Sequence, residues 1–153
     1  RFDWDLFVVA GNPVVHPGSA NAGSANVNAD NMFNSPDGLA FDQDGRLWIQ
    51  TDGNYGNSGD FAGMGNNQML CADPRSGEIR RFLTGPIGQE VTGVITTPDQ
   101  KTMFVGLQHP GATTTPEDYA AGKFSSSYPD GNGAIPRSVT LVITRDDGGV
   151  IGA

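Results

Sequence analysis

Two acidic residues stand just ahead of short apolar runs, and both could bind a metal ion. Asp37 precedes the run 38–41, and Glu90 precedes a similar run that begins at Gly93. Carboxylate oxygens are the ligands that calcium prefers, and they also suit ferric iron. If both runs are equivalent strands of a repeated unit, we expect the two carboxylates to converge. The alternative is that Asp37 only caps the turn after Pro36 and that Glu90 is a solvent-exposed acid.

Two further polar residues each follow the second strand predicted in their half of the chain. Asp52 ends the segment Gln50-Thr51-Asp52, and His109 holds the corresponding place before Pro110. We predict Asp52 as a third metal ligand, although a turn aspartate before glycine would explain it as well. His109 is predicted to contact the substrate or to support a metal ligand. The residues that carry catalysis stay unassigned.

The other reactive residue types point to structure. A single cysteine, Cys71, excludes an internal disulfide and a cysteine-based zinc site, and its apolar surroundings indicate a small buried side chain. The remaining acids of the tight turns are explained by turn chemistry, because aspartate side chains bond the backbone two residues on. They are Asp42, Asp44, Asp73, Asp99, Asp146 and Asp147.

The composition predicts an all-β protein. Among the 153 residues are 22 glycines and 10 prolines, and only 17% of the residues are charged, which disfavours long helices. The net charge of −8 argues against a nucleic acid as partner, since a phosphate backbone requires a basic surface. No apolar stretch approaches the ~20 residues of a transmembrane helix, so no membrane span is predicted.

The apolar runs pair into hairpins, and the order of hairpins occurs twice. Gly38 and Gly93 begin the two copies, 55 residues apart. Turns rich in Asp, Pro and Gly separate the paired runs. A 32-residue loop, 106–137, interrupts the second copy. The strands predicted for the two copies lie at 38–41, 46–50, 69–72 and 79–83, and at 93–96, 102–105, 138–143 and 150–151.

Four antiparallel strands repeated at this period are typical of a β-propeller blade, although a β-sandwich also contains such hairpins. We therefore predict about two four-stranded blades with long loops, at 33–87 and 88–153. Residues 1–32 would supply a strand of a preceding blade and a flexible loop. Two blades cannot close a ring, which typically needs four to eight. We expect a piece of a longer protein, and we expect its exposed strand edges to make it self-associate.

A co-linear series of segments also resembles one enzyme family, the PhoX-type alkaline phosphatases, in their C-terminal part. The similarity runs from Phe33 onward and more loosely over 1–11. The segments that carry it are FNSPDGL (33–39), GRLWIQTDG (45–53), NNQML (66–70), GEIRRFLTGP (77–86), EVTG (90–93), MFV (103–105), QHPG (108–111), PRS (136–138) and ITRDDGG (143–149).

The resemblance implies a large β-propeller that hydrolyses phosphate esters with calcium and iron ions. It also implies a bacterial parent protein that works in the periplasm or outside the cell, with the remaining blades as partners of this chain. Asp37 and Glu90 match acidic residues that hold the metals. The cysteine ligand of the family lies in the N-terminal part, so Cys71 inherits no such role.

Alternative functions stay open at this point. The stretch from Pro36 to Asp42, followed by Gly45-Arg46-Leu47-Trp48, also resembles calcium-dependent lactonase-type propellers. A non-catalytic propeller that serves as a binding scaffold is a third hypothesis. We expect the isolated chain to be inactive as a phosphatase. It would bind either calcium or no metal.

Overall fold

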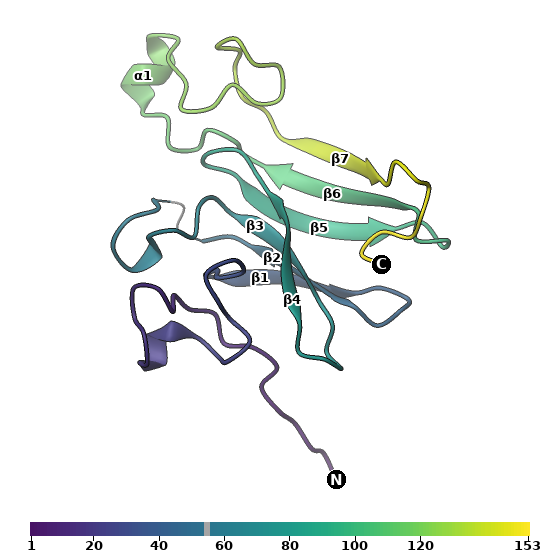
Figure 1. Ribbon diagram of the computed structural model, residues 1–153. Helices are drawn as coiled ribbons and strands as arrows, with labels where there is room; N and C mark the ends of the chain where they lie inside the picture. The colour runs from purple at the N-terminus through teal and green to yellow at the C-terminus, as the bar shows by residue number, and fades with distance from the viewer. Residues whose placement is uncertain (54–55) are drawn as a thin grey trace.

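The chain is built from short strands joined by turns and long loops (Figure 1). The computed structural model describes residues 1–53 and 56–153. The elements in chain order are η1 (Ala20–Ala22), β1 (Pro36–Phe41), β2 (Leu47–Thr51), η2 (Gly59–Phe61), β3 (Gln68–Ala72), β4 (Ile79–Thr84), β5 (Glu90–Thr96), β6 (Thr102–Gln108), α1 (Pro116–Ala120) and β7 (Val139–Thr144). In the described residues no helix is long and apolar enough to cross a membrane.

The strands form two antiparallel sheets, one for each predicted copy. The first sheet has the order β1-β2-β3-β4, and the second has the order β5-β6-β7. Neighbours in each sheet are consecutive in sequence, as in a meander. Three of the four predicted hairpins, 38–41 with 46–50, 69–72 with 79–83 and 93–96 with 102–105, are confirmed.

The first strand of each sheet carries a bulge at the glycine that begins the repeat. The pairing register shifts between Pro36 and Leu39 in β1 and between Thr92 and Val94 in β5. Gly93 has a φ of 59°, which glycine adopts without strain. A Cβ on Gly38 would collide with the Gln50 side chain. Asp37 stands one residue before its bulge glycine and Glu90 three before, so the two acids are not at equivalent positions.

Two predicted strands are absent, which corrects the sequence interpretation. Val150 and Ile151 form no strand, so the second sheet has three strands in the described residues. Ile151 is buried instead, and its N–H donates to the carbonyl oxygen of Gln100 at 3.0 Å. Residues 1–11 form no strand in this chain, apart from one isolated bridge between Gly11 and Phe33.

The loop segments are more structured than their composition suggests. Within residues 12–32, Asn12, Val27 and Asn31 are buried, and Asn31 Nδ2 donates to the carbonyl oxygen of Ile79 at 2.9 Å. The predicted loop 106–137 contains the short helix α1. Thr115 caps this helix by accepting a hydrogen bond from the Asp118 N–H at 3.1 Å.

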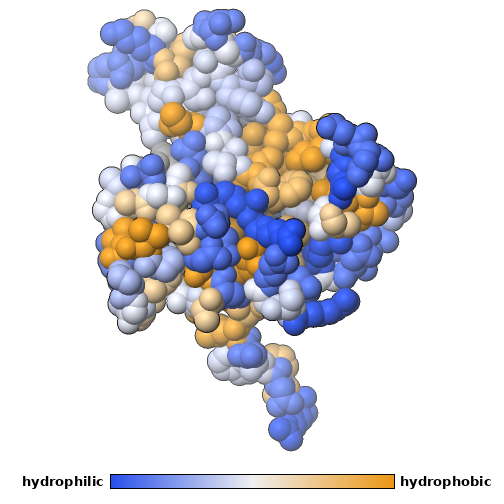
Figure 2. Space-filling model, in the orientation of Figure 1, coloured by the Kyte–Doolittle hydropathy of each residue, from blue (hydrophilic) through white to orange (hydrophobic). Residues whose placement is uncertain are grey.

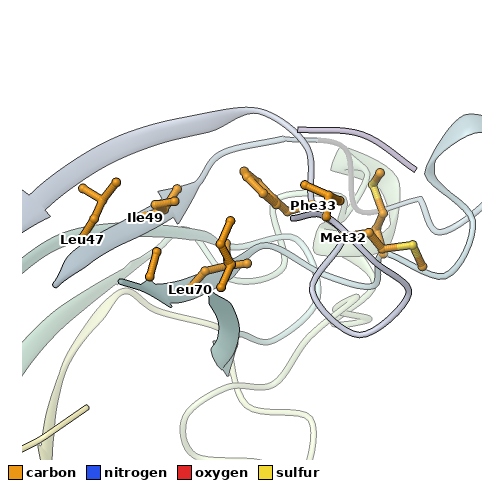
Figure 3. Packing of buried hydrophobic residues seen from close by; sticks show 9 residues of the cluster. Met32, Phe33, Leu47, Ile49 and Leu70 are labelled. Atoms are coloured by element: carbon orange, nitrogen blue, oxygen red, sulfur yellow. The ribbon is translucent and has the colours of Figure 1, made fainter. Parts of the chain in front are cut away.

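One hydrophobic core covers the face of the first sheet that is turned away from the second sheet. Leu47, Ile49 and Leu70 project from the sheet toward Met32 and Phe33 of the preceding loop (Figure 3). The N-terminal residues Phe7, Val8 and Ala10 pack against the same cluster. The segment before β1 therefore replaces a neighbouring sheet on this face.

The second core joins the two sheets. Trp48 and Met69 of the first sheet pack against Val91, Met103 and Val105 of the second. The strand β5 lies beside β1, β2 and β3, whereas no Cα of β4 lies within 8 Å of one in β7 in the described residues. The sheets are thus close together at β2 and β5 and spread apart toward β4 and β7.

A buried carboxamide pair ties the ends of the two sheets. Asn67 Oδ1 accepts hydrogen bonds from Thr51 Oγ1 at 2.9 Å and from the Gly53 N–H at 2.8 Å. Asn67 Nδ2 donates to the carbonyl oxygens of Gln89 at 2.8 Å and Gly53 at 3.2 Å. Gln89 Nε2 donates in return to the carbonyl oxygen of Asn67 at 2.9 Å. This Asn67–Gln89 brace links the end of β2, the start of β3 and the start of β5.

The hairpin between β1 and β2 is held by a buried carboxylate. Asp42 accepts hydrogen bonds from Arg46 Nε at 2.7 Å and Trp48 Nε1 at 3.0 Å, and its side chain is only 3% exposed. Burial by itself raises the pKa of Asp42, but the hydrogen bonds from Arg46 and Trp48 outweigh it and hold the pKa below its ordinary value of 3.8. The turn aspartate thereby also orients the tryptophan of the inter-sheet core.

The brace predicts that Asn67→Asp destabilises the fold by about 3 kcal/mol, because a carboxylate oxygen would face the carbonyl oxygens of Gly53 and Gln89. Urea unfolding measures the change. Asn66→Asp is the matched control, since the Asn66 side chain donates one hydrogen bond, to the Gly85 carbonyl oxygen at 3.1 Å. Its expected loss is about 1 kcal/mol. Equal losses of unfolding free energy in Asn67→Asp and Asn66→Asp would contradict the role assigned to Asn67 in the brace.

The second prediction concerns Asp42→Asn, which should lower the free energy of unfolding at pH 7 by about 3 kcal/mol. The lowered pKa means that Asp42 stabilises the fold above its ordinary value of 3.8, and that this stabilisation disappears as the pH falls through the folded-state value. The difference in free energy of unfolding between wild type and Asp42→Asn should therefore become smaller below pH 4, as measured by urea unfolding at pH 7, 5 and 3. Asp44→Asn, at a half-exposed ion pair, should cost under about 1 kcal/mol. A gap that is constant with pH would overturn the prediction.

Candidate metal site

Three potential metal ligands meet where the two sheets are closest. Asp52 directly follows β2, Glu90 is the first residue of β5 and His109 directly follows β6. Each offers one ligand atom, and these atoms lie within 4.8 Å of one another. The sequence-predicted residues Asp52, Glu90 and His109 therefore come together from two sheets. Asp37, at the exposed start of β1, is not a member of this cluster.

Each nitrogen of the His109 ring faces an oxygen acceptor. Nδ1 lies 3.3 Å from the carbonyl oxygen of Gly88, and Nε2 lies 3.3 Å from Glu90 Oε2. In the tautomer with its hydrogen on Nδ1, Nε2 would present a lone pair to a cation beside the Glu90 carboxylate. A backbone carbonyl that orients the distal ring nitrogen is also the usual arrangement of a metal-binding histidine.

Glu90 is the most enclosed member of the cluster. Its side chain is 12% exposed, against 48% for His109. Gln108 Nε2 donates to Glu90 Oε1 at 3.4 Å, so each carboxylate oxygen has a different neighbour. The carboxylate is thus held in one orientation, with Oε2 directed at the imidazole. The cluster is enclosed behind Glu90 and open beside His109.

Local backbone structure fixes the positions of the other two ligands. The Asp52 N–H donates to the carbonyl oxygen of Ser35 at 3.2 Å, which holds the end of β2 against the segment before β1. His109 has a φ of 37°, which costs a non-glycine residue on the order of 1 kcal/mol. A hydrogen bond from its N–H to Ser138 Oγ at 3.0 Å helps to offset that strain.

The donor set indicates the kind of cation that would fit. Two carboxylates and one imidazole together suit calcium less well than an all-oxygen site would, and they suit iron well. The exposed side near His109 leaves room for further ligands. The residues present therefore fit a metal ion whose remaining ligands come from water, substrate or other protein groups.

Sequence reasoning missed the residues that hold this cluster in place. The sequence assigns no role to Gln89 and shows Asn67 only within the motif NNQML, yet the Asn67–Gln89 brace fixes the backbone next to both Asp52 and Glu90. The available signal was the occurrence of carboxamides directly beside predicted strand ends. Such residues are also common in plain loops, so the signal was weak.

Cys71 lies away from the cluster, in the middle of β3, and is half-buried. Burial raises the pKa of its thiol to about 11. A thiol with this pKa is protonated near neutral pH and is a poor nucleophile and metal ligand. The structure thus agrees with the structural role predicted for Cys71.

Comparison with known proteins gives a clear relationship. The sequence model of "Alkaline phosphatase PhoX" matches residues 1–111. The solved structure "Pseudomonas fluorescens PhoX in complex with vanadate, a transition state analogue" is 60% identical, with a TM-score of 0.89. The match covers 98% of this chain and 24% of that chain. Comparison with curated proteins gave no match.

These matches decide between the two hydrolase families that the sequence resembles, in favour of the phosphatases. They also confirm the predicted fold class, because almost the whole chain follows the C-terminal region of a β-propeller enzyme. The present chain spans about a quarter of the length of its structural relative. On the similarity of sequence and fold together, the chain belongs to the alkaline phosphatase PhoX family.

Proposed function

We propose that this chain is the C-terminal portion of a metal-dependent alkaline phosphatase that hydrolyses phosphate esters. The observation that carries the proposal is the cluster of Asp52, Glu90 and His109 in a chain that is 60% identical to a PhoX structure. That relative was solved as a complex with vanadate, a transition-state analogue. A phosphate ester is accordingly the proposed substrate of the whole protein, and the remaining propeller blades are its intramolecular partners.

Asp52, Glu90 and His109 are the proposed metal ligands, with Asp37 as a further candidate on the neighbouring strand. Calcium and iron are the proposed ions of the whole protein, because carboxylates suit both and the imidazole suits iron. A bound ion would neutralise phosphate oxygens and polarise an oxygen nucleophile. Glu90, fixed by Gln108 and His109, keeps its carboxylate directed at the site. His109 offers Nε2 while Gly88 holds its other nitrogen.

The family resemblance also supports a location for the whole protein. We assign it to the periplasm or to the extracellular space of a bacterium. The division of the chain into a segment 1–32 and two blades, 33–87 and 88–153, is part of the same proposal. The two sheets fall within those blade boundaries.

A metal titration tests the site directly. Isothermal titration of the chain with calcium should show binding that Glu90→Gln weakens at least about tenfold, since a carboxylate oxygen ligand is lost. His109→Gln should weaken it less. The matched control is His16→Gln, because His16 pairs with the Asp60 carboxylate at 3.0 Å outside the three-ligand cluster. Absence of calcium binding, or an equal loss in the control, would favour the scaffold alternative.

The phosphatase activity of the isolated chain is a separate prediction. Hydrolysis of p-nitrophenyl phosphate, with calcium and iron added, should be at least about 10³-fold slower than that of a full-length PhoX. The reason is that this chain spans only 24% of the relative, so groups that stabilise the transition state come from elsewhere. Turnover comparable to the full-length enzyme would refute the prediction.

A further inference from the structure

One cross-strand pair of the second sheet is polar on both strands, and it lies at the candidate metal site. Glu90 at the start of β5 stands opposite Gln108 at the end of β6. The other pairs in register in this hairpin contain only apolar residues, glycine and threonine. Apolar surface gathers over the strands of the same sheet in the space-filling view (Figure 2). The packing of the sheet therefore does not explain why a carboxylate and a carboxamide face each other at its end.

The Gln108 carboxamide contacts one particular oxygen of Glu90. Gln108 Nε2 donates to Glu90 Oε1 at 3.4 Å, whereas Oε2 of the same carboxylate lies 3.3 Å from His109 Nε2. The two oxygens of a carboxylate are chemically equivalent, and each can accept hydrogen bonds or bind a cation. A donor beside Oε1 ends that equivalence, because it leaves Oε2 as the oxygen that faces the imidazole.

The enclosure of Glu90 makes this contact important. The Glu90 side chain is only 12% exposed, so few water molecules can replace Gln108 as the donor to Oε1. Carboxylates that bind metals are generally oriented by such hydrogen bonds. A carboxamide also supplies its donor without a positive charge, whereas lysine or arginine would form an ion pair with the carboxylate and compete with a cation. In the described part of the chain no lysine or arginine forms an ion pair with Glu90.

The number of oxygens that Glu90 can offer matters more for some ions than for others. Calcium takes 6–8 oxygen ligands and binds carboxylates through one oxygen or through both. Iron fits sites that combine a carboxylate with imidazole, as in the two-histidine, one-carboxylate sites of iron oxygenases. A hydrogen bond on Oε1 thus removes one potential ligand of a calcium ion. An ion that needs a single oxygen from Glu90 instead finds that oxygen already oriented.

We propose that Gln108 is a positioning residue that limits Glu90 to one metal-binding oxygen and thereby makes the site selective for transition-metal ions over calcium. The inference rests on the proposed function, because it takes Asp52, Glu90 and His109 as ligands of a metal ion. Gln108 itself acts through Glu90, and no contact between Gln108 and the ion is part of the proposal.

Metal titrations of the chain test this role. The probes are calcium and manganese, which stands next to iron in the order of divalent-metal affinities. Gln108→Met keeps the length of the side chain without its donor, and it should weaken manganese binding about tenfold and calcium binding less than about threefold. Gln108→Asn, whose shorter side chain ends farther from Oε1, should shift the ratio of the two affinities in the same direction. The matched control is Gln43→Met, an exposed glutamine of the turn at the opposite end of β2 from Asp52.

The outcomes separate this inference from the proposed function. If the unchanged chain binds neither ion, the metal site is wrong and the role of Gln108 falls with it. If the unchanged chain binds metal and Gln108→Met leaves the ratio of the affinities unchanged, the site stands and the role of Gln108 is refuted. An equal loss for the two ions would also refute selectivity, because it indicates general structural damage. Urea unfolding of the metal-free chain should give the same midpoint for Gln108→Met and for Gln43→Met.

A double variant tests whether Gln108 acts through Glu90. In a Glu90→Gln background the carboxylate is absent, so adding Gln108→Met should change the affinity for manganese less than about twofold. The same substitution in the unchanged chain should cost about tenfold. An equally large effect of Gln108→Met in the two backgrounds would show that Gln108 acts independently of Glu90, and it would overturn the positioning role.

Discussion

The Asn67–Gln89 brace is the interaction on which the arrangement of the two sheets depends. The Asn67 carboxamide bonds to Thr51 at the end of β2 and to Gly53 just after it, and Gln89, just before β5, donates a hydrogen bond back to the Asn67 carbonyl oxygen. All four hydrogen-bonding positions of the Asn67 side chain are used. The Asn67 side chain thereby favours one geometry, because another arrangement would leave its polar atoms without partners, although Gln89 Oε1 has no hydrogen-bond partner in the described residues. The distance between Asp52 and Glu90 follows from that geometry.

The brace also accounts for the asymmetry between the two ends of the inter-sheet contact. Polar bonds hold the sheets together near the end of β2 and the start of β5, whereas large apolar side chains lie between the sheets toward the other end of β2. Two of them, Trp48 and Phe82 of the first sheet, meet edge to face with ring centroids 4.9 Å apart. The close end brings three ligand atoms together, and the open end leaves a space of about 420 Å³ between β4 and β7. The candidate site and this space are thus two results of one wedge-shaped packing.

Much of this arrangement could be predicted from the sequence, and the failures have physical causes. The equivalence of Asp52 and His109 followed from the order of hairpins, because residues after matching strands fall at the same edge. The different offsets of Asp37 and Glu90 from their bulge glycines could not be predicted, because bulges at Gly38 and Gly93 set the register and a bulge leaves no trace in a hydrophobic pattern. The clustering of Asp52 with Glu90 needed the brace, and long-range carboxamide bonds leave no local sequence pattern.

The predicted strands at 1–11 and 150–151 failed for a related reason. An apolar run in the sequence indicates that its side chains must be buried, but it does not show whether they are buried by strand pairing or by packing on another element. Ile151 is covered by entering the inter-sheet core, and Phe7 and Val8 by packing on the first sheet, without pairing in either case. Phe2, Trp4 and Leu6 are left uncovered.

The exposure of the ligand cluster limits what it can do alone. Glu90 is enclosed by its neighbours, whereas Asp52 and His109 face solvent. Three ligand groups on an open surface leave most of the coordination sphere of a calcium ion to other donors, because calcium takes 6–8 oxygen ligands. The open side also exposes the cluster to water, which weakens every electrostatic interaction in it. A site that must hold a multiply charged phosphate therefore needs a further wall opposite Glu90, and the geometry of this chain leaves that side free for one.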